Sequence, residues 1–415
     1  MKTIFCRLVL ILGAFTGAAR AQEDDGASGK RVKSKTAAPK KARGESQPDY
    51  FWVKTDLRAG WDSNVYRTPS GTYRDPETLA DARHSPTSSP LLNPEVRIGT
   101  TPVDNGTLEL DLSLLANGDF YLGGGNTSNA NGMKTELKAE GHYRAIQSKT
   151  GLLRKLDLGL EGYVAKEDYN YLHRGTGALR KTQVAGLEEE NRYKYTETGH
   201  YLKLRTDFGS HTRWKFDIGR YSRDYEDVTG LGSYDRNVLH IKTKIEQKLG
   251  DTWELFADWD SQKLDYKSHR ANSATGGLVT GTLRVYKDRE TGFGLEYGDG
   301  SWEAKARYEI SERRDTYADY WSYKQNKVSV KMGHLTKSKD HYEIQLHKSN
   351  RDYEKETNPA GEIRTREVSS VEAGWDHKYQ WGQPSAAVSY DLQADKDKYY
   401  AYERIVAYVG IEKDF

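Results

Sequence analysis

Apolar and polar residues alternate with a period of two along most of the chain from Phe51 onward. The clearest example is 108–114, where four leucines are separated by polar residues, and 253–259 and 302–310 repeat the pattern. Successive side chains of a β-strand point to opposite faces, whereas residues on one face of a helix lie three or four positions apart. The alternation therefore predicts β-strands with one apolar face and one charged face.

Turn-forming residues divide this region at regular intervals, because Gly, Asn and Asp tolerate the backbone angles of tight turns. Short turns are predicted at residues 104–106, 149–151, 209–210, 250–251, 298–300, 338–339 and 382–383. Longer loops are predicted at residues 67–90, 123–132, 174–186, 228–235, 270–282, near Ala318, 354–361 and 395–399. Seven short turns that alternate with eight longer loops predict about sixteen strands, with fourteen to eighteen as the range.

Composition decides what kind of β-protein this is. Apolar residues make up only 36% of the chain and charged residues 30%, yet there are 29 Tyr and 9 Trp, far too many aromatic residues for a disordered chain. Apolar and polar residues also alternate along the strands of a soluble β-sandwich or β-propeller. The interior of a soluble barrel, however, must be apolar. A membrane barrel needs apolar side chains only on its lipid face. We therefore predict an all-β fold: a transmembrane antiparallel up-and-down β-barrel over residues 50–415.

The first 49 residues differ from the predicted barrel. Residues 1–21 have the pattern of a cleaved signal peptide, with Lys2 and Arg7 before an apolar run and small residues at Ala19 and Ala21. Cys6 is the only cysteine, so no disulfide framework is expected. Residues 22–49 predict a basic, disordered periplasmic tail, with seven Lys or Arg and no acidic residue between positions 30 and 43.

The segment 404–415 predicts the closing strand. Ile405, Ala407, Val409, Ile411 and Phe415 share one face. This resembles the C-terminal signature of Gram-negative outer-membrane β-barrels, although Lys413 departs from its usual apolar residue. The resemblance implies that the barrel-assembly machinery recognises the strand ending at Phe415, and that outer-membrane lipid and lipopolysaccharide surround the barrel. We expect this strand to pair with the strand beginning at Phe51, with both termini in the periplasm.

The segment 57–69 carries a second, shorter resemblance. Its run Gly60-Trp61-Asp62-Ser63-Asn64-Val65-Tyr66 resembles the first strand of β-barrel porins associated with exopolysaccharide export systems. The same run is similar to the barrels of surface-lipoprotein assembly modifiers, whose N-terminal repeat domain we do not expect here. The resemblance to the porins implies a polysaccharide export channel. It also suggests an export partner for the basic tail.

No catalytic, metal-binding or cofactor-binding arrangement is predicted, because the eleven histidines are scattered and no nucleophile motif is present. No nucleic-acid partner is expected either. The informative chemistry is instead the polar face of the strands, which we expect to line a water-filled lumen. The candidate lumen residues are Lys54, Asp56, Arg58, Arg97, Glu109, Asp111, Lys138, Glu140, Asp157, Lys203, Arg205, Lys242, Lys244, Asp258, Lys305, Arg307 and Asp376.

Two features of the loops remain open. Arg180 and Lys181 lie in a loop long enough to fold inward as a constriction. Tyrosines near the loop ends predict an aromatic girdle at the outer membrane interface, with stacking on sugar rings as the alternative; they are Tyr169, Tyr171, Tyr221, Tyr225, Tyr317, Tyr320, Tyr399 and Tyr400. Three functions fit these patterns: a polysaccharide export channel, which we favour, a general or solute-selective diffusion porin, and a non-conducting scaffold or adhesin.

Overall fold

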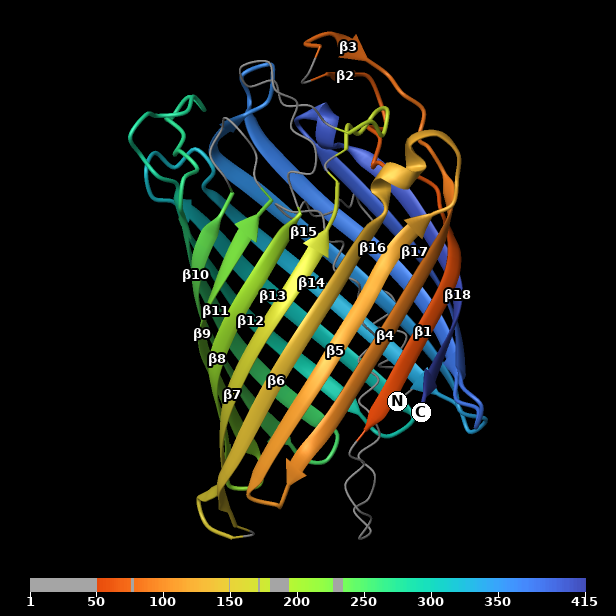
Figure 1. The fold of residues 1–415 in the computed structure, drawn as a ribbon, viewed down its shortest axis with the longest axis vertical. Helices are drawn as coiled ribbons and strands as arrows, with labels where there is room; N and C mark the ends of the chain where they lie inside the picture. Colours follow the sequence, from red (N-terminus) through yellow and green to blue (C-terminus); the bar gives the residue numbers. More distant parts are fainter. Residues whose placement is uncertain (1–50, 76–77, 149, 171, 180–193, 227–233) are drawn as a thin grey trace, which may run out of the picture.

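The computed structural model describes residues 51–75, 78–148, 150–170, 172–179, 194–226 and 234–415. The predicted signal peptide, the predicted tail, Tyr171, Arg180 and Lys181 lie outside these residues. Sixteen antiparallel strands close into one barrel (Figure 1). They are β1 (Trp52–Asp62), β4 (Ser89–Asp104), β5 (Leu108–Tyr121), β6 (Gly132–Gln147), β7 (Leu153–Asp168), β8 (Tyr195–Phe208), β9 (Thr212–Tyr225), β10 (Arg236–Leu249), β11 (Trp253–Tyr266), β12 (Val285–Gly298), β13 (Trp302–Asp315), β14 (Tyr323–Leu335), β15 (Asp340–Thr357), β16 (Ile363–His377), β17 (Gln383–Asp395) and β18 (Tyr402–Asp414).

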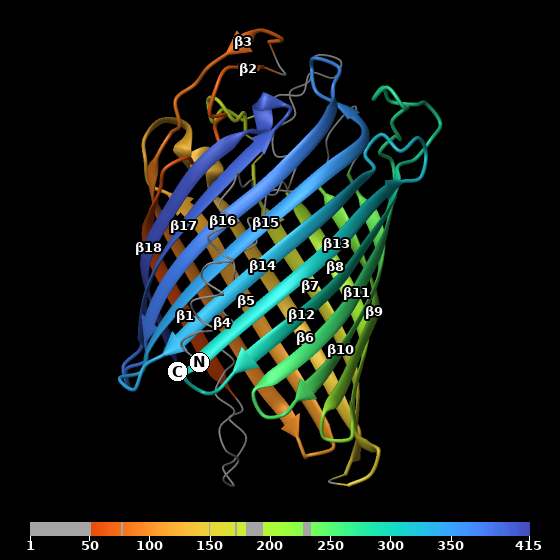
Figure 2. The same cartoon turned by 180° about the vertical axis from the view of Figure 1, so that it is seen from behind.

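The order of strands is the simplest one that a closed sheet allows. Each strand pairs with its neighbours in the sequence, and β1 pairs with both β4 and β18 (Figure 2). Two-residue strands β2 (Tyr73–Arg74) and β3 (Asp81–Ala82) form a small separate sheet within the loop between β1 and β4. The prediction of an all-β, up-and-down barrel of about sixteen strands is confirmed.

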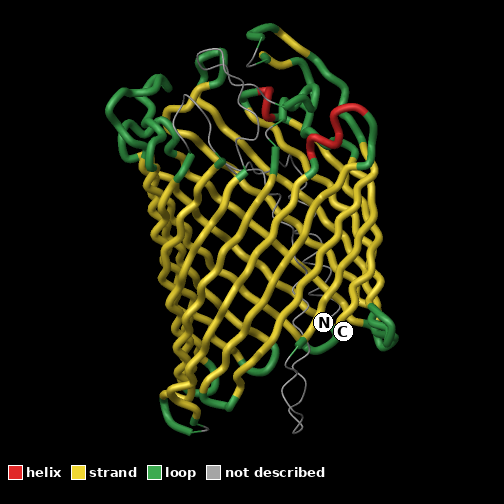
Figure 3. The backbone as a smooth tube through the Cα atoms, viewed as in Figure 1, coloured by secondary structure: helices red, strands yellow, loops and turns green. Residues whose placement is uncertain are grey.

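Short turns and longer loops emerge at opposite ends of the barrel. The 3₁₀ helices η1 (Gly125–Ala130) and η2 (Lys398–Tyr400) both lie at the long-loop end (Figure 3). Each of the seven short connections overlaps a predicted turn, although the one between β16 and β17 begins earlier than predicted, directly after His377. Some boundaries were wrong. The loop expected to begin at residue 174 follows β7, which already ends at Asp168. Residues 354–361 were expected to be a loop, but β15 continues to Thr357. Beyond an irregularity in the register, Glu356 of this extension contacts Arg364 of β16 at 2.5 Å, which stabilises the longer strand.

The closing seam joins the first and last strands of the sheet. The backbone N–H and C=O of Val53 exchange hydrogen bonds with those of Phe415 at 3.1 and 2.8 Å. The register continues with Asp56 opposite Glu412 and with Asp62 opposite Val406. The expected pairing of the strand near Phe51 with the strand that precedes Phe415 is therefore confirmed. Both strand ends lie at the short-turn end, since Trp52 also pairs with Gly99, near the end of β4.

The two faces of the sheet differ sharply in chemistry. Large apolar side chains stand exposed on one face of strand after strand, among them Leu57, Leu112, Leu160, Val328 and Val409. Charged side chains occupy the other face, and some of them meet across an intervening strand. Side chains two strands apart approach closely on the concave side of a curved sheet and diverge on the convex side. The charged face is therefore the inside of the barrel, and the apolar face is its outer surface.

Candidate functional site: the inner wall of the barrel

One cluster of the inner wall links three strands near mid-barrel. The Nζ of Lys203 on β8 lies 2.5 Å from Glu140 on β6, across β7, and 2.6 Å from Glu161 on β7. Lys138 contacts the same two carboxylates at 2.8 and 2.5 Å. Two lysines and two glutamates thus balance one another. The sequence named three of them, Lys138, Glu140 and Lys203, as candidates, and the structure brings these three together.

A second charged cluster covers β11 to β13. The Nη2 of Arg307 lies 2.8 Å from Asp258 on β11 and 2.7 Å from Glu290 on β12. Glu309 also contacts this guanidinium, at 3.1 Å. Because Arg307 reaches across β12, its side chain lies along the wall. The predicted candidates Arg307 and Asp258 therefore form one unit, to which the structure adds two carboxylates.

A third group surrounds Phe256 of β11. The Nζ atoms of Lys244 and Lys305 lie 4.5 and 4.6 Å from the centre of the Phe256 ring. Lys244 also contacts Glu246 at 2.7 Å, and Lys305 contacts Glu296. Two ammonium groups on one aromatic ring are typical cation–π contacts. Both predicted lysines thus have a partner that the alternating pattern did not reveal.

The remaining predicted residues have mostly local partners. Lys54 contacts Glu412 at 2.6 Å, and Arg58 contacts Asp56 at 2.6 Å. Further pairs are Arg97 with Glu95, Glu109 with Arg144, Asp111 with the Thr101 hydroxyl, Asp157 with Lys155, Arg205 with Asp217, Lys242 with Asp260, and Asp376 with His341. Pairs in a hydrated lumen contribute little stability individually. Collectively they give a wall on which both charges are present.

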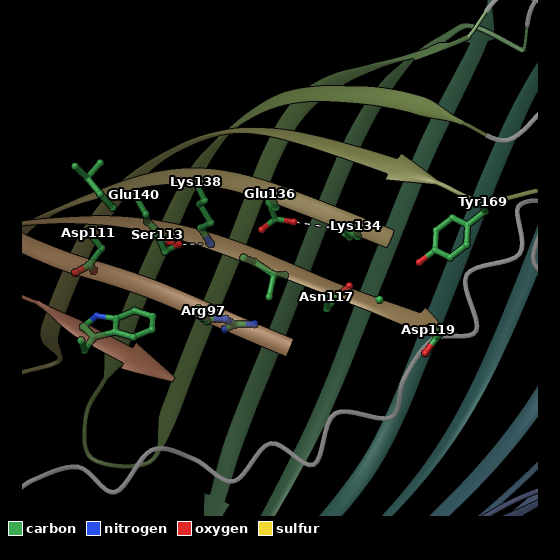
Figure 4. A pocket seen from close by; sticks show the side chains of 14 residues that line it. Arg97, Asp111, Ser113, Asn117, Asp119, Lys134, Glu136, Lys138, Glu140 and Tyr169 are labelled. Carbon is green, nitrogen blue, oxygen red and sulfur yellow. Dashed lines mark ion pairs between the residues drawn. The ribbon is translucent and has the colours of Figure 1, made fainter. Parts of the chain in front are cut away.

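A hollow of about 530 Å³ lies against β4, β5 and β6. Its lining includes Arg97, Asn117, Lys134, Glu136 and Tyr169 (Figure 4). Trp52 also lines it. The sequence named Arg97 as a candidate and set Tyr169 among the loop-end tyrosines, but it gave no reason to select Trp52. Trp52 lies against Gly99 of the neighbouring strand. Because this contact joins two strands, the alternating pattern of either strand alone does not reveal it.

Two buried networks at the long-loop end were not predicted. The fully buried Asp62 carboxylate accepts hydrogen bonds from Arg404 at 3.0 Å and from the Tyr121 hydroxyl at 3.1 Å. In the other network, Arg364 and Arg366 both contact buried Asp395 at 2.8 Å. Residues from β1, β5 and β18 meet in the first network, so no local sequence signal could have identified it.

Long loops are attached to one another over this end. His173 Nε2 lies 2.8 Å from the Asp75 carboxylate, and the Asn129 side chain donates to the Gly177 carbonyl at 3.1 Å. The Tyr73 hydroxyl lies 2.8 Å from His84 Nδ1, and burial raises the pKa of Tyr73 to about 12. Its phenol therefore remains protonated, and able to donate, at physiological pH.

The predicted outer girdle of tyrosines is wrong for several of its members. Tyr221 and Tyr225 lie on the polar, inward face of β9, where Tyr225 is buried against Tyr195 with ring centres 5.1 Å apart. Tyr399 is also buried, beside Tyr73. The phenol of a tyrosine suits a polar wall as well as a membrane interface. Tyr317, by contrast, is half exposed.

One potential metal-ligand group occurs among the described residues. Side-chain atoms of Glu303, His341 and Glu343 lie within 4.8 Å of one another. Lys331 contacts both glutamates, at 3.3 and 2.6 Å, and His341 also contacts Asp376. The cluster already contains a cation, because the Lys331 ammonium group pairs with both glutamates. In the described part of the chain, no helix is long and apolar enough to span a membrane.

Comparison with known proteins yields similarity only at the level of structure. No family model matches the sequence, and no curated protein matches it. OccAB1 of Acinetobacter baumannii is 10% identical with a TM-score of 0.47, over 91% of this chain and 99% of that one. A BenF-like porin from Pseudomonas fluorescens Pf-5 is 10% identical with a TM-score of 0.46, over 89% and 100%. A bacterial polysaccharide outer membrane secretin is 9% identical with a TM-score of 0.44, over 89% and 99%.

The barrel itself carries the conclusion about the fold. Its sixteen strands close on themselves, so no strand edge is left unpaired. Its outer surface is apolar and its inner wall is charged. Such a surface is suited to lipid outside and water inside. The chain has the fold of a Gram-negative outer-membrane β-barrel.

Proposed function

We propose that this protein is an outer-membrane channel that passes hydrophilic material through its lumen. The charged inner wall carries this proposal, because candidate residues from β1 to β16 place both signs of charge on the concave face. A sixteen-stranded barrel is wide enough to enclose an aqueous channel. Charged rings and stripes of this kind orient polar solutes in membrane pores.

Within this proposal, we favour polysaccharide export over solute uptake. The favoured version rests on the resemblance of residues 57–69 to the first strand of export-associated porins. In this arrangement the short-turn end faces the periplasm, and the basic tail, residues 22–49, meets a periplasmic export partner there. The strand ending at Phe415 is recognised by the barrel-assembly machinery, and lipopolysaccharide surrounds the outer half of the barrel. A general or solute-selective diffusion porin is the second candidate.

Conductance tests the channel. The purified protein, added to a planar lipid bilayer in salt solution, is expected to give discrete current steps. A variant that lacks residues 70–86 has lost much of the first long loop. Comparison with the wild type therefore tests whether this loop blocks the channel. If neither protein produces steps although both fold, the channel is ruled out and the scaffold remains. Deletion of residues 22–49 is then expected to abolish capture of a periplasmic partner without unfolding the barrel.

Gene deletion separates export from uptake. If the channel exports polysaccharide, loss of the gene removes surface polysaccharide and leaves growth on small nutrients unchanged. A diffusion porin gives the opposite result, with slower growth on a limiting nutrient and normal surface polysaccharide. Complementation with the full-length gene is the control in both experiments.

A further inference from the structure

Two tyrosine rings lie flat against the inner wall between β7 and β9. The ring of Tyr163 on β7 rests on Gly199 of β8, and the ring of Tyr201 on β8 rests on Gly219 of β9. A side chain at either glycine would overlap the ring above it. The missing Cβ atoms thus create two shallow recesses, and each holds a ring from the neighbouring strand.

The two rings form one surface. Their planes differ by only 16°, and their centres are 6.3 Å apart. Gly199 and Tyr201 are alternate residues of the same strand and share its inward face. The two rings therefore lie close together on the wall, each with one face against the backbone of the next strand, and both side chains remain partly exposed. We call Tyr163 and Tyr201 the tyrosine platform.

Polar groups surround the tyrosine platform. The Tyr163 hydroxyl donates to Glu197 at 2.7 Å, and Glu197 contacts Arg223 at 2.6 Å. The Tyr201 hydroxyl lies 3.0 Å from His240 Nδ1, and the other ring nitrogen of His240 lies 3.0 Å from Asp260. These partners fix the orientation of both phenols. Their carboxylate, guanidinium and imidazole groups form a polar border around the tyrosine platform.

We propose that the tyrosine platform binds sugar rings of a saccharide in the lumen. The C–H groups on one side of a pyranose ring are weakly positive, and the face of an aromatic ring is negative, so the two surfaces pack together. Hydroxyl groups at the edge of the same sugar can bond to the planar polar groups around the platform. This inference rests on the proposed channel. It names residues that would bind the saccharide, and it does so from features independent of residues 57–69.

Phe256 provides a natural contrast. Its ring also rests on a glycine of the next strand, Gly294. The ammonium groups of Lys244 and Lys305 occupy this ring, at 4.5 and 4.6 Å from its centre. A sugar would have to displace both cations to stack there. Phe256 is therefore a matched control: an aromatic ring on the same wall that the inference excludes from saccharide binding.

Single-channel recording with a soluble probe tests the inference. Cellohexaose added to the wild-type channel is expected to cause resolved current blockades, whereas a polyethylene glycol of similar mass is expected to cause none of comparable duration. The double variant Tyr163→Leu with Tyr201→Leu should shorten the blockades about tenfold, the loss expected for two stacking contacts. Phe256→Leu should leave their duration unchanged. Tyr163→Phe with Tyr201→Phe retains the rings and should keep most of the effect.

Failure of this inference can be distinguished from failure of the channel. Current steps without cellohexaose blockades, or equal shortening in the Tyr and Phe256 variants, would overturn the platform and leave the channel intact. If the wild type does not conduct, calorimetric titration of cellohexaose into the detergent-solubilised protein decides the platform separately. A heat of binding that is measured with the wild type and lost in the double leucine variant would support the tyrosine platform. If the wild type shows no binding, the tyrosine platform is rejected. The shift in gel mobility on heating checks that each variant folds.

Discussion

Asp62 shows how strongly one residue depends on partners distant in the sequence. Its side chain is fully buried at the end of β1, where its two carboxylate oxygens share the single N–H of Arg404 Nε, each at 3.0 Å, and one of them accepts from Asn64 N at 2.9 Å. The Arg404 side chain is itself mostly buried. A buried charge is tolerated when an opposite charge and hydrogen bonds replace the lost water. The pair therefore ties the first strand to the last.

Asp62→Asn is expected to lower the free energy of unfolding by about 3 kcal/mol, because it removes the carboxylate to which the mostly buried Arg404 guanidinium is hydrogen-bonded. Urea unfolding in detergent, followed by tryptophan fluorescence, measures this loss. Asp265→Asn is the matched control. Its partner Lys263 lies 2.8 Å away, but both side chains are about half exposed, at 42% and 47%, and such a pair contributes less than about 1 kcal/mol. Equal losses in the two variants would contradict this account.

Leu160 tests the outer surface in the same way. It lies near the middle of β7 and is 60% exposed on the apolar face. Leu160→Arg places a charge against lipid and is expected to cost about 2–4 kcal/mol of stability in the membrane. Ser370→Arg adds the same side chain to the inner wall, where residue 370 faces Asp391 on the adjacent strand, and should be tolerated. Unfolding measurements in lipid vesicles compare the stability of the two variants. Equal stability would indicate that Leu160 does not face lipid.

At the scale of elements, turn chemistry and alternation determine most of the structure. Gly106 and Gly250 adopt positive φ angles of 82° and 73° at two of the short turns, a conformation that glycine reaches without steric cost. The end of β15 was predicted too early because the contact from Glu356 to Arg364 joins two strands. A contact between side chains of different strands extends an element beyond the point at which its own sequence suggests an end.

The register of the closing seam gives a prediction about elements. Val53 and Phe415 exchange both backbone hydrogen bonds, so Asp56 and Glu412 form a non-hydrogen-bonded pair, the kind with the closer Cα atoms. Asp56→Cys with Glu412→Cys should form a disulfide upon mild oxidation and alter the mobility of the denatured chain in a non-reducing gel. Asp56→Cys with Asp414→Cys, a diagonal pair about 7–8 Å apart, should not. Efficient cross-linking of the diagonal pair would indicate a different register.

At the scale of the whole molecule, the two ends of the barrel have different architectures. Short turns close one end. At the other, separate loops hold one another through contacts such as His173 with Asp75, and Ser70 N with the Ala401 carbonyl at 3.0 Å. Long loops on the outside and short turns in the periplasm are typical of outer-membrane barrels. This asymmetry supports the proposed orientation, with both strand ends of the closing seam in the periplasm.

Cysteine labelling of intact cells tests the orientation. Ala274 is exposed in the loop between β11 and β12, and Ser210 is exposed in the short turn between β8 and β9. A membrane-impermeant maleimide should label Ala274→Cys on whole cells and Ser210→Cys only after the outer membrane is permeabilised. The single natural cysteine, Cys6, lies in the predicted signal peptide. The reverse labelling pattern would contradict the orientation.

The sequence by itself determined the class of fold, the alternation of faces, the seven short turns and the closing strand. These features follow from local rules: a strand exposes alternate residues to opposite faces, and a tight turn needs particular residues. Only the tertiary structure decided which charges on the inner wall meet, how the Asp62 network assembles, and that tyrosines rest on glycines of neighbouring strands. Each of these contacts joins residues of different strands, and their spacing depends on register and curvature, which no single segment encodes.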